Sequence, residues 1–171
     1  MKDKISVLDI VQDTIVDGVG LRTAIYCAGC NNKCEGCHNP ESWDINNGTY
    51  LPVENIYRYI MRNPLTNITF TGGDPLLQAE AFYDLAKLIK KNSRKNIWCY
   101  TGYLYEDIIK NKGCGFELLK QVDVLVDGKY IAELKDYKLR FKGSSNQRII
   151  DVQKSLKMQE TGSNKIILWE G

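Results

Sequence analysis

Asn67-Ile68-Thr69-Phe70-Thr71-Gly72-Gly73-Asp74-Pro75 is the stretch that most directly indicates the fold, because an apolar, β-branched run leads into a glycine-rich turn. The run predicts a strand over residues 67–71, and the turn residues predict its end. Apolar side chains then recur at helical spacing within residues 78–91, which predicts an amphipathic helix. A strand, a turn and a covering helix form the repeating unit of a parallel α/β sheet.

The same order of elements recurs along the chain. Further helical stripes lie within residues 53–61 and 104–109, and other strand-forming runs cover residues 5–10, 23–27, 97–101 and 122–126, with weaker runs at 148–152 and 165–169. No linker rich in Pro, Gly or Ser divides these elements. We therefore expect an α/β fold with a mainly parallel sheet, formed by a single domain over residues 1–171.

Composition and charge exclude several classes of protein. The chain has 171 residues, of which 43% are hydrophobic and 26% charged, and its net charge is only +2. These values are typical of a globular domain and not of a disordered or coiled-coil chain. They predict no binding to nucleic acid. No apolar run approaches the roughly 20 residues of a membrane-spanning helix, and Asp9 interrupts the start of the chain before a secretory signal could form. We expect a cytoplasmic protein that does not bind membranes.

Chemically distinctive residues follow four of the predicted strands. A group of cysteines follows residues 23–27, Gly72-Gly73-Asp74 follows 67–71, Thr101-Gly102-Tyr103 follows 97–101, and Asp127-Gly128-Lys129 follows 122–126. Because the carboxyl ends of parallel strands lie at one edge of a sheet, these segments are expected to meet there. The sequence therefore predicts one functional site at that edge.

Four of the six cysteines, Cys27, Cys30, Cys34 and Cys37, fall within eleven residues, which in a reducing compartment indicates metal binding or redox chemistry. The spacing admits three interpretations. All four thiolates could bind zinc, although structural zinc sites usually separate their two ligand pairs by a dozen or more residues. All four could hold the iron–sulfur cluster of an electron carrier. Alternatively, Cys30, Cys34 and Cys37 hold a [4Fe–4S] cluster with one iron open to a small molecule, and Cys27 only ends the strand.

The motif Cys30-x-x-x-Cys34-x-x-Cys37, followed one strand later by Gly72-Gly73-Asp74, resembles the radical S-adenosylmethionine enzymes. Asp17-Gly18-Val19-Gly20-Leu21-Arg22 and His38-Asn39 narrow the resemblance to the activating enzymes of glycyl-radical enzymes. Residues 98–103, 122–129 and 143–152 are similar to the activating proteins of anaerobic (class III) ribonucleoside-triphosphate reductase. The resemblance covers residues 13–152 and implies an open partial (βα) barrel of the radical S-adenosylmethionine type.

The resemblance also implies a set of site residues. Cys30, Cys34 and Cys37 would ligate the [4Fe–4S] cluster, whose open iron would bind S-adenosylmethionine. The remaining predicted contacts are to that cofactor. The adenosyl part would lie against the backbone of Gly36, Cys37 and His38, the methionyl part near Gly72 and Gly73, and the ammonium near Asp74, with Thr101 at the neighbouring strand end.

The same resemblance implies the reaction and the partners. One electron from the cluster would cleave S-adenosylmethionine, and the resulting 5′-deoxyadenosyl radical would take a hydrogen atom from a glycine of the reductase large subunit. A flavodoxin-like protein would supply the electrons. The alternatives are an activase of another glycyl-radical enzyme, a non-catalytic four-cysteine electron carrier and a zinc-stabilised binding module.

Overall fold

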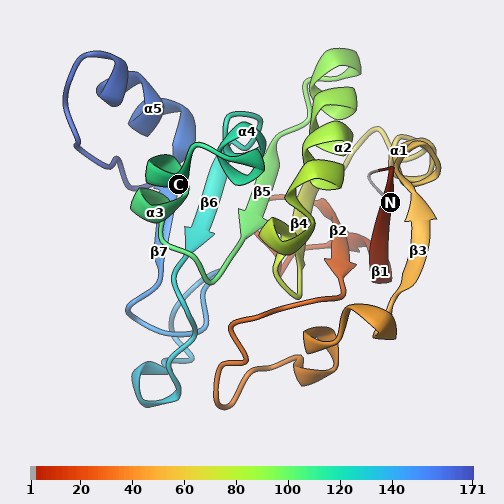
Figure 1. Ribbon diagram of the computed structural model, residues 1–171, viewed down its shortest axis with the longest axis horizontal. Coiled ribbons are helices and arrows are strands. Elements are labelled where there is room, and N and C mark those ends of the chain that lie inside the picture. Colours follow the sequence, from red (N-terminus) through yellow and green to blue (C-terminus); the bar gives the residue numbers. More distant parts are fainter. Residues whose placement is uncertain (1–2) are drawn as a thin grey trace.

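The computed structural model describes residues 3–171 and contains an open seven-stranded sheet (Figure 1). The strands lie in the order β3-β1-β2-β4-β5-β6-β7. Their bounds are β1 Lys4–Thr14, β2 Arg22–Cys27, β3 Thr49–Pro52, β4 Asn67–Gly72, β5 Ile97–Tyr100, β6 Val124–Asp127 and β7 Arg148–Asp151. The central strands β2, β4, β5 and β6 are parallel, whereas β1, β3 and β7 join antiparallel to their neighbours at the two sides. The expected α/β class is confirmed, and the sheet does not close.

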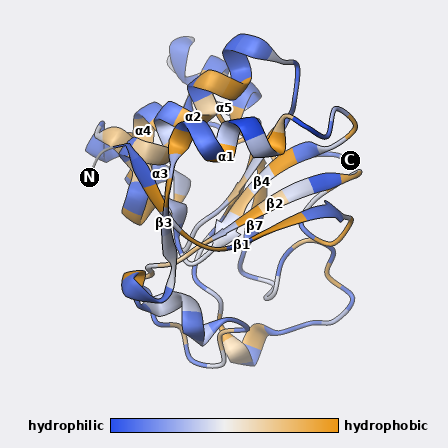
Figure 2. Ribbon diagram, turned by 90° about the vertical axis from the view of Figure 1, so that its right-hand side faces the viewer, coloured by the Kyte–Doolittle hydropathy of each residue, from blue (hydrophilic) through white to orange (hydrophobic). Residues whose placement is uncertain are grey.

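The five α-helices of the described residues lie on one face of this sheet (Figure 2). They are α1 Val53–Ile60, α2 Ala79–Asn92, α3 Tyr105–Asn111, α4 Cys114–Leu119 and α5 Val152–Glu160. Short 3₁₀ helices are η1 Pro40–Trp43, η2 Ile45–Asn47, η3 Pro75–Gln78 and η4 Ala132–Leu134. The main hydrophobic core fills the space between sheet and helices, where Phe70 and Phe82 pack with ring centroids 4.8 Å apart. Burial of this apolar surface is the main source of stability.

The opposite face of the sheet carries a second, smaller hydrophobic cluster. Because strand side chains alternate between faces, Cys99 belongs to the main core, whereas Trp98 belongs to the second cluster. Residues 14–22 fold back over this second face. The Thr69 hydroxyl donates a hydrogen bond to the Asp17 carbonyl oxygen (2.8 Å), and the Arg22 guanidinium lies 5.3 Å from the centroid of the Trp98 ring.

Most predicted elements agree with the structure to within a few residues, with a few differences. The strand expected over residues 5–10 extends over Lys4–Thr14. The run at 165–169 pairs with β7 only through an isolated bridge between Leu168 and Ile150. Two backbone bonds flank that bridge, from Asp151 N–H to the Ile167 oxygen (2.9 Å) and from Trp169 N–H to the Ile149 oxygen (2.9 Å). Strand β3 and helices α4 and α5 were not predicted. Across residues 3–171, no helix is both long and apolar enough to cross a bilayer.

Candidate functional site

The loops that follow β2, β4, β5 and β6 gather at one edge of the sheet, at the lower side of Figure 1. We call this edge the carboxyl edge, residues 72–74 the Gly-Gly-Asp loop, and residues 27–39, which begin at the last residue of β2, the cysteine loop. Backbone bonds join the two loops directly: Gly73 N–H donates to the Cys27 oxygen (2.7 Å) and Asp74 N–H to the Gly29 oxygen (2.8 Å). The structure therefore brings together segments that lie about one βα unit apart in the sequence.

Two glycines make this close approach possible. Gly72 has a φ of +96°, and a Cβ on it would lie 2.6 Å from the Cys27 nitrogen. A Cβ on Gly73 would lie 2.4 Å from the Gly29 oxygen. Only a residue without a side chain fits at either position. In this structure the two glycines thus pack the Gly-Gly-Asp loop against the cysteine loop, which is a reason for glycine that does not depend on any cofactor.

Asp74 is buried and holds three segments together. Its carboxylate accepts hydrogen bonds from the Asn32 side-chain amide (2.9 Å), the Thr101 hydroxyl (2.9 Å), Gly102 N–H (3.0 Å) and Leu76 N–H (3.0 Å). Burial raises the pKa of the Asp74 carboxyl, and these donors oppose that shift. A carboxylate has about four lone-pair sites, so the donors of this chain occupy them all. A contact between Asp74 and a cofactor ammonium would require one of them to leave, and that contact stays a prediction.

The four clustered cysteines differ in their surroundings. Cys27 is fully buried at the end of β2, and burial raises the pKa of its thiol. Cys30, Cys34 and Cys37 are half-buried, and all are free thiols. Burial also raises the pKa of the Cys30 thiol, while N–H donors of Asn32 and Lys33 oppose the shift. The contrast in burial fits the interpretation in which Cys27 only ends the strand and the other three are available to a ligand.

The cysteine loop offers donors that suit one kind of metal site better than the other. Within residues 3–171, no three Cys, His, Asp or Glu side chains converge as they would around a single metal ion, so the zinc interpretation gains no support. A [4Fe–4S] cluster is larger than an ion and is held by thiolates. Three free, partly exposed thiols on one loop are the donors that such a cluster uses. The cysteine loop therefore fits an iron–sulfur cluster.

A pocket with a volume of about 440 Å³ opens beside the cysteine loop. This volume lies within the range of sites for small ligands, roughly 300–1,000 Å³. Of the predicted site residues, Cys37, His38 and Gly72 line the pocket. The His38 ring lies 5.4 Å from the Tyr130 ring, and a Cβ on Gly36 would also approach Tyr130, at 3.5 Å. The other lining residues are Val16, Asp17, Tyr26, Asn39, Thr71, Tyr100, Tyr130, Phe141, Lys142, Gly143 and Gln147.

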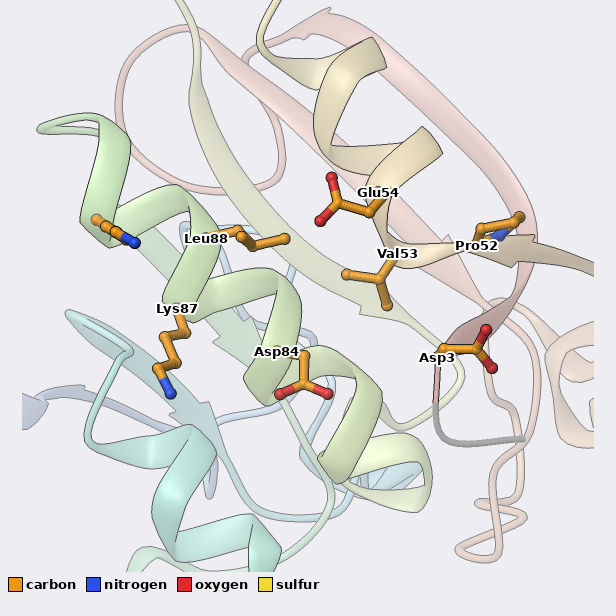
Figure 3. Close-up of a pocket in the computed structure, with 8 residues that line it drawn as sticks. Asp3, Pro52, Val53, Glu54, Asp84, Lys87 and Leu88 are labelled. Atoms are coloured by element: carbon orange, nitrogen blue, oxygen red, sulfur yellow. The ribbon is translucent and has the colours of Figure 1, made fainter.

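A second pocket of about 440 Å³ lies on the helical side, between the first turn of α1 and the middle of α2 (Figure 3). Its lining includes Asp84, Lys87 and Glu54, and no cysteine takes part. It contains none of the predicted site residues, whereas Cys37, His38 and Gly72 line the other pocket. The pocket beside the cysteine loop is therefore the candidate site.

Sequence reasoning missed the polar partners that organise the carboxyl edge. The Asp127 carboxylate is buried and accepts hydrogen bonds from Arg148 (3.0 and 2.5 Å) and from Tyr105 N–H (2.9 Å), and Arg148 also pairs with Glu106 (2.7 Å). Asn32, inside the cysteine loop, is the second omission. The position of Asn32 between two predicted cysteine ligands could have indicated a role. Its hydrogen-bond partner Asp74, however, lies 42 residues away in the sequence.

Comparisons with known proteins show the family to which this chain is similar. Residues 16–150 match the family described as "4Fe-4S single cluster domain". The anaerobic ribonucleoside-triphosphate reductase-activating protein of Enterobacteria phage T4 is 39% identical over 140 residues, which are 78% of this chain and 86% of the relative. The protein of that name from Escherichia coli K12 is 33% identical over 144 residues, covering 78% of this chain and 90% of the relative.

A more distant similarity points to the same chemistry. The pyruvate formate-lyase-activating enzyme of Clostridium pasteurianum is 35% identical over 118 residues, which are 64% of this chain and 50% of that enzyme. The matched segment of the family model includes the cysteine loop and the Gly-Gly-Asp loop. With most of both chains aligned at 32–39% identity to the reductase activators, the expected resemblance is confirmed. This chain belongs to the family of anaerobic ribonucleoside-triphosphate reductase-activating proteins.

Proposed function

We propose that this chain is a radical S-adenosylmethionine activase that generates the glycyl radical of an anaerobic ribonucleoside-triphosphate reductase. The observation that carries the proposal is the meeting of the cysteine loop and the Gly-Gly-Asp loop beside a pocket of about 440 Å³. Family membership supports the same reaction. In this proposal one domain, an open partial (βα) barrel of the radical S-adenosylmethionine type, spans the chain.

We assign the cluster to Cys30, Cys34 and Cys37. When bound, it supplies one electron that cleaves S-adenosylmethionine into methionine and the radical that takes hydrogen from the reductase glycine. The chain's own contribution is to bind and orient. The backbone at Gly36, Cys37 and His38 would hold the adenosyl part.

The opposite side of the same site would hold the methionyl part of S-adenosylmethionine. In our assignment Gly72 and Gly73 face it, with Asp74 and Thr101 behind them at the ends of β4 and β5. The pocket is partly lined by apolar and aromatic side chains, among them Tyr26, which would exclude water from a reactive radical. We propose a flavodoxin-like protein as the electron donor.

The test is ligand substitution in protein purified without oxygen. We expect Cys30→Ala, Cys34→Ala and Cys37→Ala each to lose the iron and acid-labile sulfide of the cluster, because each thiolate closes one iron. Cys114→Ser is the matched control, since Cys114 is exposed and far along the chain in α4. Cys27→Ser should also retain iron and sulfide. Loss of the cluster in Cys27→Ser with normal folding would show that four thiolates are needed and that no iron is left open.

A second measurement separates an activase from an electron carrier. S-adenosylmethionine added to the wild-type protein should change the visible and electron paramagnetic resonance spectra of the cluster, because the cofactor binds the open iron. Incubation with the reductase and a low-potential reductant should then yield a glycyl radical. A cluster whose spectra ignore the cofactor contradicts the proposed function. A radical formed only on a different glycyl-radical enzyme contradicts the proposed partner.

A further inference from the structure

Asn32 lies between Cys30 and Cys34 and links the cysteine loop to the sheet. Its side-chain nitrogen donates to Asp74 Oδ2 (2.9 Å) and lies within hydrogen-bonding range of the Cys30 sulfur (3.8 Å). A primary amide carries two N–H donors, so one group can serve both acceptors. The side chain is half-buried, whereas the adjacent Asn31 is exposed.

The acceptor on the far side of Asn32 is a fixed point. Asp74 is 1% exposed, and its other donors are Thr101 and Gly102, which follow β5, and Leu76 in η3, which follows β4. A buried carboxylate with this many donors is costly to move, because any shift leaves a charge or a donor unsatisfied. The hydrogen bond from Asn32 to Asp74 therefore fixes one side of the cysteine loop relative to the sheet.

Gly102 provides the space that the Asn32 amide occupies. A Cβ on Gly102 would lie 2.3 Å from Asn32 Nδ2 and 2.6 Å from its Cγ. The backbone of Gly102 does not have a positive φ, so glycine is not required there by backbone conformation. Glycine is required there instead because a side chain would occupy the space of the Asn32 amide.

We propose that Asn32 is a positioning residue that couples the Cys30 thiolate to Asp74 and thereby sets both the placement of Cys30 and the reduction potential of the cluster. The inference rests on the proposed function in one respect, namely that Cys30 is a cluster ligand. It adds a residue that is not one of the motif cysteines and does not belong to the Gly-Gly-Asp loop, and it assigns Asp74 a role through Asn32.

The expected effect on potential follows from charge. A donor near a cluster thiolate stabilises the reduced state, which carries one more negative charge, so its removal favours the oxidised state. Removing one typical hydrogen bond changes an equilibrium constant by about threefold to tenfold. For a one-electron couple a tenfold change corresponds to about 59 mV. Removing the Asn32 amide should therefore lower the midpoint potential by tens of millivolts.

The experiment measures the midpoint potential of the cluster in the full chain, without S-adenosylmethionine, by anaerobic spectroelectrochemical titration. Asn32→Ala should lower the potential and speed the loss of iron to a chelator. Asn31→Ala is the matched control, because it removes the same amide one residue away at an exposed position. It should leave both readouts at the wild-type value. Equal potentials in Asn32→Ala and wild type overturn the proposal.

A second variant approaches the same amide from another loop. Gly102→Ala should displace the Asn32 side chain without changing any residue of the cysteine loop, and should lower the potential as Asn32→Ala does. In the double variant no Asn32 amide is present for the added methyl group to displace. The midpoint potential of its cluster should therefore equal that of Asn32→Ala alone. Additive shifts in the double variant contradict the proposal, because they show that the two residues act separately.

The design also distinguishes this proposal from the function on which it rests. Wild-type protein that contains no iron or sulfide, or a cluster that survives Cys30→Ala, refutes the assignment of Cys30 as a ligand. A wild-type cluster that requires Cys30, together with an unchanged potential in Asn32→Ala and Gly102→Ala, refutes only the role of Asn32. A lowered potential in both variants with Asn31→Ala unchanged supports it.

Discussion

Gly72→Ala tests whether the glycine joins the Gly-Gly-Asp loop to the cysteine loop by packing. Gly72 pairs with Cys27 across parallel strands β4 and β2, so the added methyl group would meet backbone that cannot rotate away, at 2.6 Å from the Cys27 nitrogen. The φ of +96° adds a separate cost, because an L side chain in such a conformation costs about 1–2 kcal/mol. A control must remove this second cost from the comparison.

Gly162→Ala is that control, because Gly162 has a φ of +81° and a Cβ added there would have no atom within 4 Å. Beyond the strain that both variants share, Gly72→Ala should lose about 1–3 kcal/mol from overpacking. It should lose about 1 kcal/mol more from the hydrogen bond between Gly73 N–H and the Cys27 oxygen (2.7 Å). The total difference between the variants is about 2–4 kcal/mol in the free energy of unfolding.

Thermal unfolding of both variants and wild type under the same anaerobic conditions provides the measurement. For a chain of this size about 1 kcal/mol corresponds to roughly 2–4 °C, so Gly72→Ala should melt roughly 4–16 °C below Gly162→Ala. Iron content should fall in Gly72→Ala and stay at the wild-type value in Gly162→Ala. If the two variants melt together, the close contact with Cys27 contributes nothing and the reasoning is refuted.

Three further predictions concern the polar groups at the carboxyl edge. Arg148→Ala should lower the free energy of unfolding in urea by about 3–5 kcal/mol, because it leaves the fully buried Asp127 without its ion pair. Lys154→Ala, at a side chain that is 67% exposed, should lower it by at most about 1 kcal/mol. Similar losses in the two variants would refute burial as the cause of the difference. Arg148 lowers the pKa of Glu106, so the stability that Glu106 contributes is present above its ordinary pKa and is lost as the pH falls. Glu106→Gln should therefore lose less stability on acidification than wild type does. The difference should be well under about 1 kcal/mol, because the Glu106 side chain is 54% exposed. The same loss of unfolding free energy on acidification in both proteins would contradict this. Asp74→Asn should destabilise the protein by about 1–3 kcal/mol in thermal unfolding, because the new amide faces donors where the carboxylate accepted them, and an unchanged melting temperature would count against this network.

The sequence predicted the parallel strands and helices α1, α2 and α3 because these elements rest on local periodicity. Strand β3, Thr49–Pro52, escaped prediction because it is a four-residue strand at the side of the sheet, without a buried side chain, and it exists through pairing with β1. Helix α5 escaped because only Val152 and Ser155 are buried in it, so it has almost no apolar stripe. The run at 165–169 was predicted as a strand because it is apolar. It pairs with β7 only at one bridge, and its Trp169 ring packs 5.2 Å from Trp98, so the apolar side chains serve packing more than a strand.

The site shows the same division between local and long-range information. That the four loops would share an edge followed from strand direction, and the structure places them there. Which side chains would bind one another did not follow, because the bond from Asn32 to Asp74 spans 42 residues and that from Arg148 to Asp127 spans 21. Such bonds depend on the relative position of whole strands. A sequence motif reports only the residues on its own loop.

The Gly-Gly-Asp loop illustrates what this means for interpreting a motif. Interpreted as a cofactor-binding motif, Gly72 and Gly73 are small so that a ligand can approach. In the structure, the atoms that approach them are the backbone of Cys27 and Gly29, and the carboxylate of Asp74 accepts a donor from Asn32. All three residues therefore act on the cysteine loop before any cofactor is present. It follows that substitutions in this loop should impair cluster retention as well as S-adenosylmethionine binding, and that a defect in iron content must be measured before a defect in activity is assigned to the cofactor.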